Sequence, residues 1–378
     1  MEDYKARYEH WLTDPTFDEA TKAELRAIAS DENEIKERFY MDLEFGTAGL
    51  RGIIGAGTNR MNTYVVRKAT QGLANYILKV GGAEKGVAIA HDSRRMHDEF
   101  TDCAALTLAA NGIKAYVFDD LRPTPELSFA VRELGCIAGI NITASHNPPE
   151  YNGYKVYWED GAQITPPHDS GIMSEVLAVR DYSDCRIMEK QEAIEKGLYV
   201  VIGAKVDDAY IAQLKKNVLH PEAIKEQAKN LKIVYTPLHG TGLVPAVRVL
   251  KELGFENVTV VPEQEKPDGD FPTVSYPNPE AEEAFTLGLK LAKEIDADLV
   301  LATDPDADRL GVRVKDKEGN YHTLTGNMSG CLLADYEIGQ RKALKGLPND
   351  GILIKTIVTS NLADAICKYY GVAEYECL

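Results

Sequence analysis

Residues 138–155 read AGINITASHNPPEYNGYK, an apolar run that passes directly into a turn rich in proline, asparagine and glycine. Such a run, bounded by turn residues, predicts a buried strand that ends where the turn begins. Ser145 stands in this turn, so we expect its hydroxyl to be displayed at the carboxyl end of a strand rather than buried. The Asp160-Gly161 pair that follows predicts a hairpin, which would hold Lys155 beside Ser145.

A second informative stretch lies far along the chain. Residues 297–303, ADLVLAT, have the composition of a buried strand and lead into DPDADR at 304–309. The carboxylates of Asp304, Asp306 and Asp308 occupy alternate positions after that strand. Hard cations prefer such oxygen ligands, so the pattern predicts a Mg²⁺ site rather than a zinc site. The alternative is a solvated acidic turn.

Two other phosphate or metal loops begin in a similar way. An EF-hand would need Gly at its sixth position and Glu at its twelfth, where this chain has Arg309 and Lys315, so a calcium loop is excluded. A haloacid-dehalogenase-type phosphatase also places two aspartates at a strand end. That class gives the Ser145 segment no role, and it predicts phosphate release that survives Ser145→Ala.

Together, the two segments resemble the diagnostic motifs of the α-D-phosphohexomutase family, the phosphoglucomutases and phosphomannomutases. In that family a phosphoserine lies within T-A-S-H-N-P, and a Mg²⁺ loop has the form D-[GP]-D-x-D-R. The stretches FGTAGLRG at 45–52 and PNPE at 277–280 also look like family landmarks. The resemblance covers the whole chain. Trp11-Leu-Thr-Asp-Pro15 and Thr21-Lys-Ala-Glu-Leu25 look like the long α-phosphoglucomutase branch.

The resemblance implies roles for individual residues. Ser145 would carry the phosphate, and Asp304, Asp306 and Asp308 would hold Mg²⁺ together with the phosphoserine. Lys155 matches the family lysine that is assigned to acid/base or phosphate contact; the alternative is a surface lysine.

Three further residues have roles that the sequence leaves open. His146 would contact the phosphoryl group or the sugar, or it is a structural residue of the turn. Arg51, between glycines, and Arg309, beside the carboxylates, would bind phosphate by paired hydrogen bonds, although a surface loop or charge balance would also explain them. The implied cofactors are Mg²⁺ and glucose 1,6-bisphosphate as activator.

The main departure from the family pattern is that this sequence ends at Leu378. Its sequence contains neither the Glu-Glu-Ser-type sugar loop nor the R-x-S-G-T-type phosphate loop of the family. We therefore expect a C-terminally truncated, poorly active form that keeps the phosphoryl-transfer centre but lacks much of the substrate clamp.

Alternating helix and strand patterns predict an α/β fold of consecutive similar domains with mixed, mainly parallel sheets, the third domain being incomplete. We expect a helical arm and a phosphoserine domain over 1–203, a metal-binding domain over 204–315 and a partial domain over 316–378. In the arm, Trp11, Leu25, Ile28, Ile35 and Phe39 recur at roughly helical spacing, which predicts packing helices. The loop 239–242, HGTG, is expected to be a plain turn between strand and helix.

Composition limits the classes of partner. The chain has 378 residues and a formal net charge of −17, which argues against nucleic acid and anionic membranes as partners. Its six cysteines show no C-x-x-C pair, and no apolar run is long enough to span a bilayer, so we expect reduced thiols in a cytoplasmic protein. A monomer or weak homodimer is expected.

The leading functional hypothesis is a phosphohexomutase that interconverts glucose 1-phosphate and glucose 6-phosphate through phosphoserine and glucose 1,6-bisphosphate. The alternatives are a phosphomannomutase or phosphopentomutase of the same family, or a non-catalytic fragment that binds phosphosugars.

Overall fold

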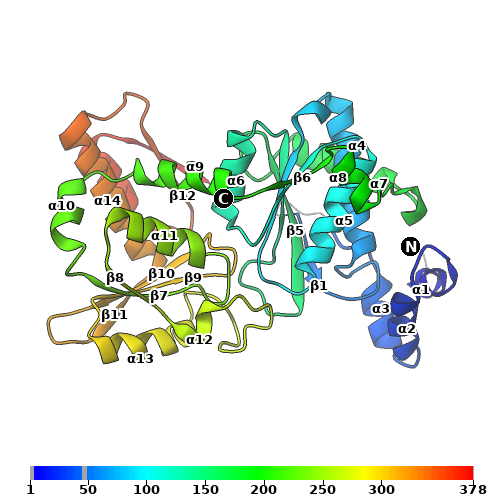
Figure 1. Ribbon diagram of the computed structural model, residues 1–378, viewed down its shortest axis with the longest axis horizontal. Helices are drawn as coiled ribbons and strands as arrows, with labels where there is room; N and C mark the ends of the chain where they lie inside the picture. Colours follow the sequence, from blue (N-terminus) through cyan, green and yellow to red (C-terminus); the bar gives the residue numbers. More distant parts are fainter. Residues whose placement is uncertain (1–3, 45–48, 378) are drawn as a thin grey trace.

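The computed structural model describes residues 4–44 and 49–377, which form a helical arm and three successive α/β units (Figure 1). The arm contains α1 (Tyr4–Thr13), α2 (Glu19–Ala27) and α3 (Glu32–Phe39). Asp18 and Asp31 cap the second and third of these helices by accepting hydrogen bonds from backbone N–H groups. The predicted apolar residues form one core around Trp11, whose ring stacks on Phe17 at a centroid distance of 4.2 Å. The expected packing arm is confirmed; Ile28 is only partly buried in it.

The first unit is built on a sheet of six strands in the order β1-β5-β4-β2-β3-β6. Its strands are β1 (Leu50–Ile53), β2 (Val87–His91), β3 (Ala115–Phe118), β4 (Ala138–Ile142), β5 (Tyr151–Trp158) and β6 (Tyr199–Ile202). Its helices are α4 (Thr63–Val80), α5 (His97–Ala110), α6 (Thr124–Glu133), α7 (His168–Ala178) and α8 (Lys190–Glu195), with 3-10 turns η1 (Ala83–Lys85) and η2 (Tyr182–Asp184). Strands β4, β2, β3 and β6 are parallel, whereas β5 runs antiparallel to both of its neighbours, β4 and β1.

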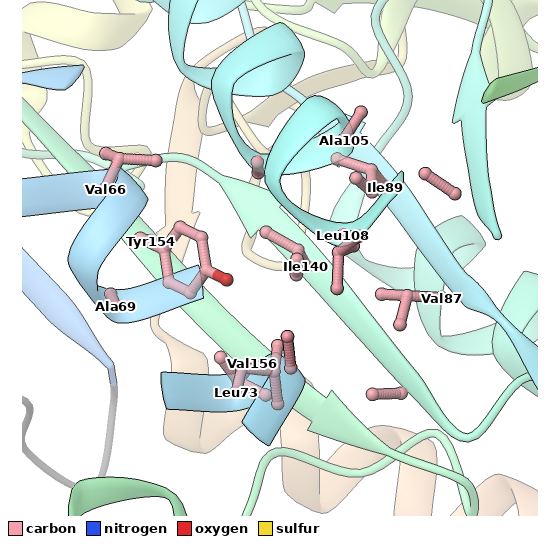
Figure 2. Close-up of a cluster of buried hydrophobic side chains, with 14 of the residues drawn as sticks. Val66, Ala69, Leu73, Val87, Ile89, Ala105, Leu108, Ile140, Tyr154 and Val156 are labelled. Atoms are coloured by element: carbon pink, nitrogen blue, oxygen red, sulfur yellow. The ribbon is translucent and has the colours of Figure 1, made fainter. Parts of the chain in front are cut away.

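The first sheet is buried on both faces. On β2, Val87 and Ile89 pack with α4 and α5, and this core is shown in Figure 2. The intervening Ala88 and Ala90 pack with Leu127 and its neighbours on α6. Because side chains alternate along a strand, this continuous apolar run supplies both faces of the sheet at once.

The second unit has a sheet in the order β11-β10-β9-β7-β8. Its strands are β7 (Lys232–Thr236), β8 (Asn257–Val260), β9 (Leu299–Thr303), β10 (Leu310–Lys315) and β11 (Tyr321–Leu324). Its helices are α9 (Ala204–Lys215), α10 (Pro221–Gln227), α11 (Leu243–Leu253), α12 (Pro262–Glu265), the 3-10 turn η3 (Glu282–Phe285) and α13 (Thr286–Ile295). The third unit contains α14 (Gly326–Lys345), β12 (Ile352–Thr356), α15 (Leu362–Tyr370) and β13 (Ala373–Cys377), with its two strands parallel.

Consecutive α/β units with mixed sheets agree with the predicted fold class. One local expectation needs correction. Strand β11 pairs with β10 in the second sheet, so the second unit extends beyond residue 315, where the sequence placed its end. The hairpin at the Asp160-Gly161 turn is short: it forms one bridge between Tyr157 and Gln163, with backbone hydrogen bonds from Trp158 N–H to Ala162 and from Ile164 N–H to Val156.

Among the helices of the described residues, none is both long enough and apolar enough to cross a membrane.

Candidate active site

Ser145 follows β4 in the turn that leads to β5. Its backbone is left-handed, with φ 53°, a strained conformation for a residue with a side chain. The Ser145 N–H donates to Thr143 Oγ1 at 2.8 Å, and its hydroxyl donates to Asp304 Oδ2 at 2.8 Å. The side chain is buried, with only 3% of the residue exposed. The expectation of a displayed serine is therefore wrong for this structure, because the aspartate loop of the second unit covers it.

Arg94 anchors the serine loop, and no local pattern in the sequence singles it out. It follows β2, is fully buried, and donates to the backbone carbonyls of Ser145 at 2.6 Å, Pro148 at 2.8 Å and Tyr151 at 2.9 Å. It also bonds the carbonyl of Asn147. A guanidinium carries five donors in a fixed fork, so one side chain can fix several carbonyls of an irregular loop. One signal could have pointed to Arg94. Strands β2 and β4 are parallel neighbours, so the residues that follow them, Arg94 and Ser145, lie at the same edge of the sheet.

The three predicted metal ligands lie together in the turn between β9 and β10. Asp304, Asp306 and Asp308 each offer a carboxylate oxygen within 4.8 Å of the others, and the first two are fully buried. The loop 239–242 supports this turn: the Thr241 N–H donates to the Pro305 carbonyl at 2.8 Å. The expected plain turn is thus also a brace for the aspartate loop.

The electrostatics of the cluster favour a bound cation. Burial, together with the charges of Asp306 and Asp308, raises the pKa of Asp304 to about 9. Burial would raise the pKa of Asp306 as well, but the Lys155 charge and the hydrogen bonds from Asp304, Lys155 and Thr124 together lower it. Asp306 Oδ1 is buried without a hydrogen-bond partner. Three close carboxylates, one with an orphaned oxygen, match the oxygen ligands that Mg²⁺ takes.

Lys155 extends from β5 and pairs with the cluster directly. Its Nζ lies 2.9 Å from Asp306 Oδ2 and 3.9 Å from Asp308 Oδ2. Burial would lower the pKa of Lys155, but the charges of Asp306, Tyr157 and Asp308 and the hydrogen bond to Asp306 together raise it. The lysine is therefore a charged partner of the cluster, which is the protonation state of a proton donor rather than of a base.

His146 contacts the serine hydroxyl directly. Its Nδ1 is 3.0 Å from Ser145 Oγ, and its ring meets Tyr276 edge to face at a centroid distance of 5.5 Å. Burial and the charges of Arg309 and Arg51 lower its pKa to about 4. The imidazole is thus neutral near pH 7.

The two predicted phosphate-binding arginines lie near the cluster without forming part of it. Arg51 on β1 is exposed and contacts Asn147 Oδ1 at 3.4 Å. The backbone N–H of Arg309 donates to Asp304 Oδ1 at 3.0 Å. Arg309 and Arg313 both line a cavity of about 750 Å³ between the second and third units. The motif around Arg51 begins at residue 45, and residues 45–48 lie outside the described part of the chain.

A second group of metal-ligating side chains, His91, His97 and Asp98, lies between the end of β2 and the start of α5. The two imidazole rings stack at a centroid distance of 4.5 Å with an interplanar angle of 13°. A metal binds in the plane of an imidazole, and two nearly parallel stacked rings share no such plane. This arrangement is therefore a ring stack rather than a coordination site.

Comparison with known proteins identifies the family. Residues 42–183 match the family model "Phosphoglucomutase/phosphomannomutase, alpha/beta/alpha domain I", and residues 208–319 match the model for domain II. The chain belongs to the phosphoglucomutase/phosphomannomutase family. The matched regions contain Ser145 and the three aspartates, so the family assignment and the observed cluster concern the same residues.

Curated relatives in this family carry different names. The chain is 40% identical to a phosphoglucomutase from Staphylococcus epidermidis over 90% of its length and 60% of that protein. It is 38% identical to a phosphoribomutase from Saccharomyces cerevisiae, with 83% and 53% covered, and 37% identical to a phosphopentomutase from Pongo abelii, with 97% and 61% covered. The chain thus spans between 53% and 61% of the length of these relatives.

Solved structures of the phosphoglucomutase/phosphomannomutase family share the fold. A Thermus thermophilus protein assigned as a phosphomannomutase matches with a TM-score of 0.72 and 25% identity, covering 89% of this chain and 69% of that chain. A family member from Burkholderia thailandensis matches with a TM-score of 0.65 and 23% identity, covering 86% and 64%.

Proposed function

We propose that this chain carries the phosphoryl-transfer centre of a sugar-phosphate mutase, with Ser145 as the phosphate carrier and glucose 1-phosphate and glucose 6-phosphate as the preferred substrate pair. The observation that carries the proposal is the 2.8 Å hydrogen bond from Ser145 Oγ to Asp304 Oδ2, which joins residues 159 positions apart. It brings the serine of one unit to the carboxylate cluster of the next.

Phosphoryl transfer needs a nucleophile, charge neutralisation and a proton shuttle. When the phosphate passes from Ser145 to a sugar hydroxyl, the bond from phosphorus to Oγ breaks, a bond to the sugar oxygen forms, and the sugar hydroxyl loses its proton. His146, neutral and 3.0 Å from Oγ, is the group that we propose takes this proton. Lys155 is charged before the transfer and compensates Asp306, and it would donate a proton to Oγ as Oγ leaves.

Asp304, Asp306 and Asp308 would hold Mg²⁺, which supplies positive charge for the phosphoryl oxygens when bound. The support is the orphaned Asp306 Oδ1 and the Lys155 ammonium, which lies close to the carboxylates of Asp306 and Asp308. Arg309 and Arg51 would bind the non-transferred phosphate. Arg309 has the better support, because it lines the large cavity beside the cluster.

The test is phosphorylation of the protein itself. The chain is incubated with Mg²⁺ and labelled glucose 1,6-bisphosphate, and peptide mass mapping locates the label. We expect label on Ser145 that is lost in Ser145→Ala and in Asp306→Asn. Label on another residue, or label that survives Asp306→Asn, would refute the proposal.

Sugar class needs a separate comparison, because relatives named for glucose, ribose and pentose mutases match with similar identity. The phosphorylated chain is offered glucose 1-phosphate, mannose 1-phosphate or ribose 1-phosphate, and loss of label from Ser145 is timed. Glucose 1-phosphate is expected to remove label fastest; faster removal by the ribose ester would replace the preferred pair with pentose phosphates.

A further inference from the structure

Asp306 receives its hydrogen bonds in an asymmetric way. Both donors to its carboxylate reach the same oxygen: Thr124 Oγ1 at 2.8 Å and Lys155 Nζ at 2.9 Å both contact Oδ2. The other oxygen, Oδ1, is buried and has no partner. A carboxylate whose one oxygen is fully engaged cannot rotate freely, so the second oxygen is presented in one fixed direction.

The side chain of Asn141 orients the hydroxyl of Thr124. Asn141 Nδ2 donates to Thr124 Oγ1 at 2.6 Å, which occupies the oxygen as an acceptor and leaves its hydrogen for Asp306. Asn141 on β4 lies opposite Lys155 on β5 in the register of the sheet. Two paired positions of the sheet therefore place both donors to Asp306 Oδ2: Lys155 donates directly, and Asn141 orients the Thr124 hydroxyl.

The contact also joins two units of the chain. Thr124 begins α6 in the first unit, and Asp306 lies in the loop of the second unit, 182 positions later. The Thr124 N–H donates to the Asp306 backbone carbonyl at 2.9 Å. Thr124 therefore binds Asp306 twice, by its backbone to the backbone and by its hydroxyl to the carboxylate. The N–H groups of the first helical turn have no partner within the helix, which makes this a natural docking point.

We infer that Thr124 is a positioning residue for the metal: together with Lys155 it holds Oδ2 of Asp306 and leaves Oδ1 as the ligand atom. The inference rests on the proposed function only in its choice of Mg²⁺ as the ion. Partners that orient metal-binding side chains typically contribute about 10–100-fold to metal affinity. The site is then complete only when the first two units are docked.

The test is Mg²⁺ binding alone, measured by isothermal titration calorimetry on the full chain without sugar phosphate. Thr124→Val keeps the shape of the side chain and removes the hydroxyl, and we expect it to weaken Mg²⁺ binding by about tenfold or more. Thr124→Ser restores the hydroxyl and should return the affinity to within about threefold of the wild type. Thr107→Val is the matched control, since Thr107 is also buried and its hydroxyl donates to the Cys103 carbonyl within α5, away from the aspartate cluster.

A second variant guards against a folding defect in Thr124→Val. Asn141→Ala leaves Thr124 in place but frees its hydroxyl, and it should weaken Mg²⁺ binding less than Thr124→Val and more than Thr107→Val. Equal affinity of the wild type, Thr124→Val and Asn141→Ala would overturn this inference while leaving the metal assignment intact. Failure of the wild type to bind Mg²⁺ would overturn both.

Discussion

Replacing Arg94 by Met should release the serine loop. The guanidinium donates to four carbonyls of that loop, of which the Ser145 carbonyl is the one whose bond is fully buried. Leaving this buried carbonyl unpaired costs about 1–3 kcal/mol. The other three carbonyls can form hydrogen bonds to water instead. Asp92 loses a cation whose Nε lies 3.4 Å from its Oδ2, at a cost of about 3 kcal/mol. That value is the low end of the range, because burial already raises the pKa of Asp92 and a proton can replace the cation.

The two contributions sum to about 4–6 kcal/mol of local stability, and every 1.4 kcal/mol corresponds to about a tenfold change in an equilibrium constant. Hydrogen exchange is the suitable assay, because the N–H groups of Ser145, Asn147 and Tyr151 are all hydrogen-bonded inside the loop. Their protection should fall by about a thousandfold or more in Arg94→Met.

The neighbouring residue offers a matched control. Arg95→Met also removes a guanidinium, but Arg95 pairs with Asp270 at the surface, where such pairs contribute at most about 1 kcal/mol. Loop protection should therefore stay near the wild-type level in this control. If Arg94→Met folds and keeps loop protection within tenfold of the wild type, the account of Arg94 is wrong.

Three further predictions concern other parts of the molecule. Trp11→Ala should cost about 3–5 kcal/mol in urea unfolding, because the indole is the centre of the arm's core; a loss below about 1 kcal/mol would show that the arm contributes little. Burial and a hydrogen bond to the Asp207 carboxyl raise the pKa of Glu126 from 4.5 to about 8, so stability present below pH 4.5 should be lost as pH rises toward 8. In Glu126→Gln that slope in denaturation midpoint should flatten, and an unchanged slope would contradict the assignment. Gly240→Ala would place a Cβ 2.4 Å from the Pro305 backbone, so it should displace the aspartate loop and weaken Mg²⁺ binding, whereas Gly330→Ala, with nothing within 4 Å, should not.

Some parts of this structure follow from short segments of sequence. The apolar runs before Ser145 and Asp304 specify strands wherever the rest of the chain lies, because strand formation depends on local patterning and turn residues. The alternation of three carboxylates within one short turn likewise keeps them near one another in sequence, and in the structure their oxygens lie within 4.8 Å of one another. The helices of the arm follow in the same way from their spacing and from the capping residues Asp18 and Asp31.

Other parts depend on contacts between distant segments. Ser145 is buried because a loop 159 positions later covers it, and Arg94 reaches its carbonyl across 51 positions. Local patterns carry no information about such distances, so the sequence predicted an exposed serine and did not single out Arg94.

The orientation of the metal ligands is the clearest case. Composition and spacing predicted that Asp306 binds a cation, but which of its oxygens is free depends on Thr124 and Lys155, held 182 and 151 positions away. A hydrogen bond is directional and acts over about 3 Å, so the choice exists only after the sheet register and the docking of two units have placed the donors. Short segments of sequence specify which residues can do chemistry here, whereas contacts between distant segments select the atoms that face the reaction.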